Sequence, residues 1–166
     1  ILSEQTLMQE GWHYEIEDPS APLTYKGVVF NEMKGAYSSP DNYLAKVIIE
    51  SLFPKHIYGV DSGGNPAEIT NLTYENFFTF WESYYHPSNS FIFFYGNDDP
   101  DERLKLMENY LKPFKKKKVK SAVPLAKPFK KAKKLEFPYL ATEGEDLDKK
   151  HFLTVNWKLP DASDPV

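Results

Sequence analysis

The stretch QEGWHYEIEDPSAPLTYKGVVFNEMKGAYSSPD, residues 9–41, decides the fold because it places a strand pattern directly before a helix pattern. Its first part alternates Trp12, Tyr14 and Ile16 with polar residues. A period of two is typical of a strand with one covered face, so we expect a half-buried strand over residues 11–16. Two prolines follow the strand pattern and predict a turn before the helix begins.

The helix pattern in the same stretch carries a carboxylate, Glu32. Val28, Val29 and Met33 recur at roughly helical spacing and form an apolar stripe beside it. A carboxylate on such a helix can ligate a metal ion. On the residues alone, the pattern is more typical of a solvated or ion-paired glutamate at the edge of the stripe, because most glutamates lie at the surface.

Capping residues and periodicity mark the remaining elements. In chain order we expect a helix from Pro40 to Pro54 with Ser39 as N-cap, an ordered loop over 57–72, a helix capped by Thr73, a strand over 91–95, a helix from Pro100 and a strand over 151–159. The first of these helices should pack one face on a sheet. The aromatic face of the Thr73 helix should be core, the strand over 91–95 should be buried on both sides, and the last strand has no companion in this chain.

Composition excludes several classes of protein. The chain has 166 residues, of which 41% are hydrophobic and 16% aromatic, which is too apolar for a disordered protein. It has no cysteine, so no disulfide framework forms, and no apolar run approaches the ~20 residues that span a bilayer.

The charge is unevenly distributed. Residues 112–134 contain eleven lysines and no acidic residue, so the net charge of −4 combines +11 in this run with −15 elsewhere. Such a run can bind nucleic acid, anionic lipid or an acidic partner. Its prolines and the scarcity of aromatic residues favour a solvated tether, so we expect no nucleic acid and no membrane among the partners.

Six phrases carry a resemblance to a known family. They run in register along the chain: GWHYEIED (11–18), PLTYKGVVFNEMKG (22–35), YSSPDNYL (37–44), LFPKHIYGVDSGGNPAEITNLTYENF (52–77), YYHPSNSFIFFYGNDDP (84–100) and KKHFLTVNWKLP (149–160). Together they resemble the presequence-protease and falcilysin branch of the pitrilysin/insulinase zinc metallopeptidases. We expect a zinc metallopeptidase that degrades short unstructured peptides, such as targeting presequences, in an enclosed chamber.

The resemblance also assigns a role to Glu32. In the family an inverted His-x-x-Glu-His helix supplies two zinc ligands and the general base, and a later helix supplies a distal glutamate; Glu32 in NEMKG falls at the position of that glutamate. The chain has four histidines, at positions 13, 56, 86 and 151, and no two are close enough for the inverted motif. We therefore expect no catalytic residue in this chain, with zinc bound by the intact enzyme and not stoichiometrically by this fragment.

The expected fold class is α+β. The resemblance implies the second half of a pitrilysin/insulinase-type α/β domain, like that of the mitochondrial processing peptidase, over residues 1–114. A lysine-rich linker over residues 115–135 and the start of a second, inactive peptidase-like domain over residues 136–166 follow.

The segment Asp61, Ser62, Gly63, Gly64 allows two interpretations. It superficially resembles the nucleophile segment of chymotrypsin-like proteases, but Val60 precedes the aspartate and the helical pattern does not fit paired β-barrels. The glycines are better explained as positions that let a loop turn tightly. The family resemblance then implies a substrate-binding role for these four residues at the wall of the chamber.

Two other functions stay open. A non-catalytic structural or peptide-binding member of the same superfamily would keep the fold without the metal site, although retention of Glu32 favours the enzyme. A lysine-tethered nucleic-acid binder is the third hypothesis, and the acidic remainder of the chain argues against it. The expected partners are peptide substrates and the remainder of the same polypeptide, and the resemblance favours a mitochondrial or other organellar lumen.

Overall fold

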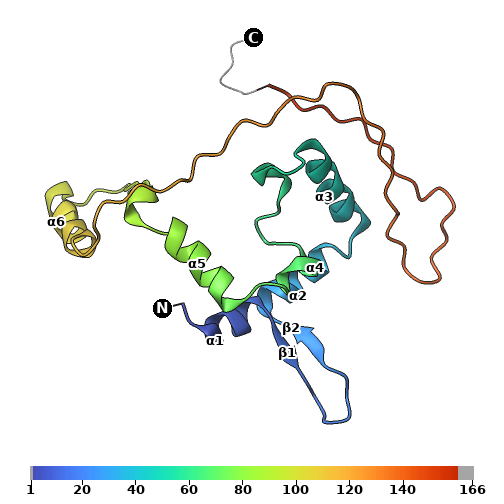
Figure 1. Ribbon diagram of the computed structural model, residues 1–166, viewed down its shortest axis with the longest axis horizontal. Helices are drawn as coiled ribbons and strands as arrows, with labels where there is room; N and C mark the ends of the chain where they lie inside the picture. The colour runs from blue at the N-terminus through green and yellow to red at the C-terminus, as the bar shows by residue number, and fades with distance from the viewer. Residues whose placement is uncertain (1, 161–166) are drawn as a thin grey trace. The chain divides into compact units, whose positions relative to one another are not determined.

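A computed structural model describes residues 2–160. The described chain divides into two compact units, residues 2–72 with 123–160, and residues 73–122. The helices and strands lie within residues 4–111, and the rest of the described chain is irregular (Figure 1).

The first unit begins with a short helix and a β-hairpin. Helix α1 (Glu4–Thr6) and a π-helical turn, η1 (Leu7–Gly11), lead into strand β1 (His13–Glu15). Strand β2 (Thr24–Lys26) pairs with it in antiparallel register, with Tyr14 opposite Tyr25. The strand predicted over residues 11–16 is therefore confirmed at its centre. Strand β2 was not predicted, because three residues after a proline are too few to show an alternating pattern.

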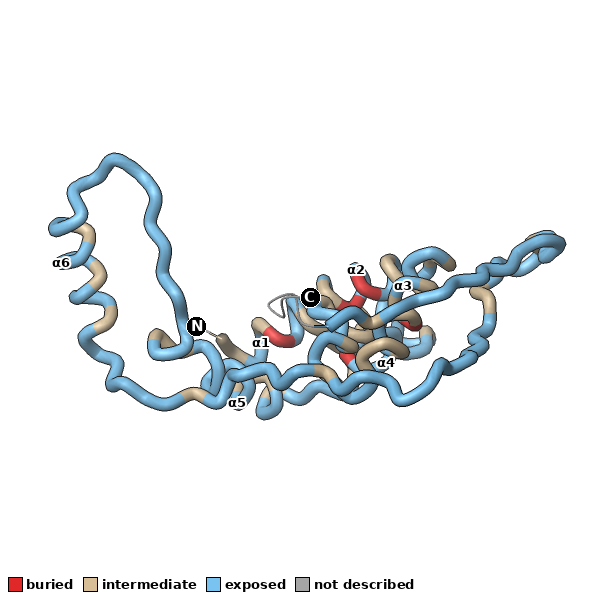
Figure 2. The backbone as a smooth tube through the Cα atoms, turned by 90° about the horizontal axis from the view of Figure 1, so that it is seen from above, coloured by how far each residue is buried: buried red, intermediate tan, exposed pale blue. Residues whose placement is uncertain are grey.

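Helix α2 (Val28–Ala36) follows the hairpin without a loop and confirms the predicted helix around Glu32. Its N-cap is Gly27, whose φ of 144° lies in a region that side chains other than glycine rarely adopt. The helix buries Phe30 and Met33, which form a core with Ile69 from helix α4 (Pro66–Ile69). Figure 2 shows these buried positions in red.

Helix α3 (Pro40–Leu52) starts where Ser39 and Pro40 predict. Ser39 occupies the N-cap with extended backbone, but its side chain makes no capping hydrogen bond. The expectation that this helix packs on a sheet is wrong, because its buried residue Val47 faces a cavity whose other wall is the irregular segment 137–152. The loop expected over 57–72 contains two helical turns, η2 (Ile57–Gly59) and α4.

The second unit contains two helices that begin at their predicted positions, after Thr73 and at Pro100. Helix α5 (Tyr74–Tyr84) has a capping box in which Thr73 Oγ1 accepts from the Asn76 N–H at 3.2 Å. A 3₁₀ turn, η3 (Pro87–Asn89), follows it. Helix α6 (Pro100–Leu111) is capped by Asp99, whose carboxylate accepts the N–H groups of the first turn.

Two predictions for this unit are wrong. The aromatic face of α5 is not core, since α5 contains no buried residue and Tyr84, on that face, is 39% exposed. The segment 91–95 forms no strand and is exposed along its length, with Tyr95 at 96%. The two exposures have the same cause. No described element of this chain pairs with residues 91–95 or covers the aromatic face of α5.

The lysine-rich run is irregular, as its prolines predict. Within the second unit, the Lys117 ammonium donates to the Glu82 carbonyl at 3.0 Å. The predicted strand over 151–159 is also irregular as far as residue 160, and Leu153 is 96% exposed. A strand without a neighbour has no ladder to join, so its pattern alone cannot produce one.

The described chain is thus helix-rich with one two-stranded sheet. This composition is compatible with the α+β class and with part of a larger peptidase domain.

Candidate functional site

Glu32 lies in the middle of α2 with an exposed side chain. It makes no hydrogen bond or ion pair within residues 2–160. Nor does the described part of the chain contain a cluster of three His, Cys, Asp or Glu side chains that could hold a metal ion. The carboxylate nevertheless fits the role of a single ligand, because both its oxygens are free of competing partners and the helix that carries it is anchored by buried residues.

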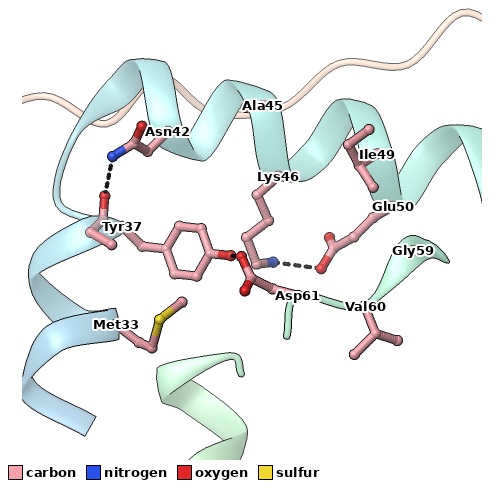
Figure 3. A pocket seen from close by; sticks show the side chains of 11 residues that line it. Met33, Tyr37, Asn42, Ala45, Lys46, Ile49, Glu50, Gly59, Val60 and Asp61 are labelled. Carbon is pink, nitrogen blue, oxygen red and sulfur yellow. Dashed lines mark hydrogen bonds and ion pairs between the residues drawn. The ribbon is translucent and has the colours of Figure 1, made fainter. Parts of the chain in front are cut away.

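A cavity of about 380 Å³ lies next to α2, and Glu32 is not among the residues around it. Helix α2, helix α3 and the loop after η2 form its walls (Figure 3). The lining residues are Met33, Ala36, Tyr37, Asn42, Ala45, Lys46, Ile49, Glu50, Gly59, Val60 and Asp61.

The central polar contact of this cavity joins Tyr37 to Asp61. The Tyr37 hydroxyl donates to Asp61 Oδ2, and Figure 3 shows the ring reaching across to the loop. Burial, followed by the bond to Asp61, raises the pKa of Tyr37 to about 12. The same bond lowers the pKa of Asp61, with further help from the Gly63 N–H.

Other polar groups of the cavity pair among themselves. The Lys46 ammonium lies 2.7 Å from Glu50 Oε1, one helical turn away, and 5.8 Å from the centre of the Tyr37 ring. The Asn42 amide donates to the Ala36 carbonyl at 2.8 Å, which ties the start of α3 to the end of α2. These pairings satisfy the polar groups of a cavity wall that is otherwise lined by apolar side chains such as Met33, Ile49 and Val60.

The loop 61–64 turns tightly against α2. The Gly63 N–H donates to Asp61 Oδ1 at 2.8 Å, and the Gly64 N–H donates to the Asp61 carbonyl at 3.1 Å. A Cβ at Gly63 would lie 2.3 Å from Met33 Sδ, and Gly64 has a φ of 91°. The tight turn expected from the glycines is therefore confirmed.

The structure brings only some of the predicted site residues together. Asp61, Gly63 and Gly64 lie in the loop beside α2, and Ser62 is exposed in the same loop. Their predicted contact with substrate stays a prediction. Sequence reasoning missed Tyr37 and the contact of Met33 with the loop, and no local pattern marks a tyrosine that bonds to an aspartate 24 positions later.

Three histidines bond to nearby or distant backbone groups. His13 Nδ1 lies 2.6 Å from the Met8 carbonyl, His56 Nε2 lies 2.7 Å from the Pro124 carbonyl, and His86 Nδ1 accepts from the Ser88 N–H at 3.1 Å. Such contacts are those of structural histidines. Within residues 2–160, no hydrogen bond joins a histidine to Ser62, so the described geometry does not form a serine-protease triad.

Comparison with known proteins identifies the relatives of the chain. The family model described as "Peptidase M16 inactive domain" matches residues 71–166, which is more than half of the chain. The match begins ahead of the predicted linker, and the division of the chain at residues 114 and 136 stays a prediction.

Individual relatives are similar over nearly the whole chain. Presequence protease 1, chloroplastic/mitochondrial, of Arabidopsis thaliana is 51% identical over 93% of the chain. Protein HypA of Clostridium perfringens is 48% identical over 97%, and the mitochondrial presequence protease of Mus musculus is 38% identical over 98%. The chain spans between 14% and 17% of the length of these three relatives.

Proposed function

The chain belongs to the peptidase M16 family, and we propose that it is part of a zinc metalloendopeptidase of the presequence-protease branch. Its substrates would be short unstructured peptides, which can enter an enclosed chamber that excludes folded proteins. Support for this assignment comes from the names of the plant and mouse relatives and from their identity to the chain over more than nine-tenths of its residues.

The single observation that carries the proposal is the state of Glu32. Its side chain is exposed and unpaired within the described chain, although it sits on a helix whose neighbouring position, Met33, is buried. An acidic side chain with no partner on an anchored helix is available to a ligand from outside this segment. We propose that this ligand is the zinc ion and that Glu32 is its distal protein ligand.

Zinc, when bound, would act as a Lewis acid that activates a water molecule and polarises the scissile carbonyl. The task of this segment is to hold one carboxylate in place. Glu32 would contribute one negatively charged oxygen ligand, and the packing of α2 would fix the direction in which it points. Two histidine ligands and the general base would come from another part of the polypeptide, since catalytic zinc needs three protein ligands.

The peptides and the remainder of the polypeptide are accordingly the proposed partners. We also propose that Asp61, Ser62, Gly63 and Gly64 shape the wall of the peptide chamber near α2. An organellar location is supported by the plant and mouse names. The bacterial relative is nearly as similar as the plant one, so identity in this segment does not separate organellar from bacterial members.

A second candidate function is a non-catalytic, peptide-binding member of the family. It is favoured by the description of the matching model, which is that of an inactive domain. The two candidates differ in zinc, because a member without catalysis has no need of a third ligand at Glu32.

The decisive experiment substitutes Glu32 in the complete polypeptide. Glu32→Gln removes the charge of the ligand and keeps its shape, so zinc affinity and peptidase activity should fall together, affinity by at least tenfold. The matched control is Glu108→Gln, which changes another exposed helical glutamate without a described partner. Competition with a chelator measures zinc affinity, and cleavage of a quenched fluorescent peptide measures peptidase activity. Unchanged zinc affinity in the Glu32→Gln protein would reject the ligand assignment.

A further inference from the structure

We propose that Tyr37 and Asp61 form a clasp that positions α2, and with it Glu32, for metal binding. The inference rests on the proposed function for its consequence, but the clasp itself is a feature of the geometry. Tyr37 and Asp61 are positioning residues in this proposal, since neither touches the metal or the substrate.

The clasp acts at one end of a helix that is already fixed at the other. At the N-terminus, Gly27 packs so closely that a Cβ there would lie 2.2 Å from the Gly11 carbonyl oxygen. In the middle, Phe30 and Met33 pack with Ile69. Helix α2 ends at Ala36, and the next residue is Tyr37, so its C-terminal turn depends on what Tyr37 contacts.

The contacts of Asp61 fix the orientation of the carboxylate that holds Tyr37 at the C-terminal end of α2. One carboxylate oxygen accepts from the Tyr37 hydroxyl, as Figure 3 shows, and the other accepts from the Gly63 N–H. Both oxygens are engaged, so the carboxylate has one orientation. Gly63 then lies directly against Met33, which neighbours Glu32 in the sequence. The loop therefore contacts α2 at two points, and the Tyr37 hydroxyl is the only one of these contacts that a single-atom change removes.

The bond between Tyr37 and Asp61 should affect metal binding as well as stability. A ligand must be held close to its productive geometry, and the packing that holds the element carrying it therefore contributes to metal affinity. Glu32 lies in the middle of α2, five positions before Tyr37, so the turns between them connect it to the clasp. Loosening of those turns would let the carboxylate sample directions that do not reach the ion.

The test compares Tyr37→Phe, Asp61→Ala and the double variant in the complete polypeptide. Tyr110→Phe serves as the matched control, because Tyr110 is exposed on α6 and makes no described hydrogen bond. Two quantities are measured: zinc affinity by competition with a chelator, and hydrogen exchange of the amides of residues 31–36. We expect Tyr37→Phe to weaken zinc binding by up to about fivefold, because one partner of the bond is exposed, and to accelerate exchange in these amides.

The double variant distinguishes the clasp from general destabilisation. If the two side chains act through one hydrogen bond, Tyr37→Phe should add nothing to the loss of affinity in an Asp61→Ala background. Additive losses would overturn the clasp, as would unchanged exchange of residues 31–36 in Tyr37→Phe.

The same measurements separate this proposal from the assignment of Glu32. If Glu32→Gln lowers zinc affinity but Tyr37→Phe accelerates exchange without affecting zinc, the positioning role is wrong and the ligand assignment stands. If Glu32→Gln leaves zinc binding unchanged, the ligand assignment fails, and the exchange data alone then decide whether the clasp holds α2.

Discussion

Residues 7–72 and residues 73–122 are both built around helices with clear start signals, yet only the first region buries side chains. Pro40 and Pro100 begin α3 and α6, and Thr73 caps α5, as their sequences predict. The buried apolar residues of the described chain nevertheless all lie in the first region: Leu7, Phe30, Met33, Val47 and Ile69.

The contrast separates two sources of helix stability. Caps and periodicity act within a few residues, so they work in either region. Burial needs a second element at the right distance, and α2 has three such neighbours in η1, β2 and α4. Helix α5 has an aromatic face with nothing described to cover it. We therefore expect the first region to respond to changes in packing and the second to changes in capping.

The largest expected effect comes from Gly27→Ala in the first region. The alanine Cβ would overlap the Gly11 backbone, and the φ of 144° is strained for any residue with a side chain. Such a backbone conformation costs about 1–3 kcal/mol, so with the added overlap we expect a loss near ~3 kcal/mol. Hydrogen exchange should accelerate throughout residues 7–72 and stay unchanged in residues 73–122.

The matched control is Gly35→Ala on the same helix. A Cβ at Gly35 meets nothing within 4 Å and the residue is helical, so alanine should stabilise α2 by about 0.5–1 kcal/mol. If Gly27→Ala behaves like Gly35→Ala, the contact between the end of η1 and the start of α2 does not hold the first region together.

A smaller effect is expected for the cap of α5. Thr73→Ala removes a side-chain oxygen that accepts the Asn76 N–H, and loss of such a cap costs about 1 kcal/mol. Ser39→Ala is the comparison, because Ser39 occupies the N-cap of α3 without bonding to it and should cost almost nothing. Exchange of the first-turn amides of α5 and α3 measures both changes. Equal losses would mean that the capping hydrogen bond of Thr73 does not control helix stability.

Prediction from the sequence succeeded for local start signals and failed for burial. The starts of α2, α3, α5 and α6 were predictable because each depends on a cap, a proline or a short apolar repeat. The exposure of the segment 91–95 was not, because an apolar run of that length is typical of a buried strand whether or not its partners are present. Periodicity reports which residues can be buried and does not report what buries them.

In the candidate site, too, local features were predictable from the sequence and contacts between distant residues were not. Glu32 was found through the phrase NEMKG and its family resemblance, and the helix around it is confirmed. The bond between Tyr37 and Asp61 joins residues 24 positions apart, and neither local sequence predicts this contact. The tight turn at Gly63 and Gly64 was predictable from the glycines, but its contact with Met33 required the fold.

The smallest expected effect is a pH dependence of the first region that depends on Tyr37. Its folded pKa, about 12, lies above the ordinary value of 10.0. A raised pKa means that the bond to Asp61 contributes fully below pH 10 and is lost as the pH rises from 10 to 12. Asp61 is exposed, so solvent keeps this contribution below about 1 kcal/mol.

Comparison with the Tyr37→Phe variant isolates this effect from the titration of other tyrosines and of lysines. Alkaline difference absorbance between the two proteins reports the ionisation of Tyr37 alone, and we expect its midpoint near pH 12. Stability of the first region should fall more steeply between pH 10 and 12 in the unsubstituted protein than in the variant, because only the former has this bond to lose. On the acid side the direction reverses, since the lowered pKa of Asp61 makes its contribution present above the ordinary value of 3.8 and lost as the pH falls below it. Parallel curves at both extremes would show that the hydroxyl and the carboxylate do not interact, and the first region would then owe its order to burial alone.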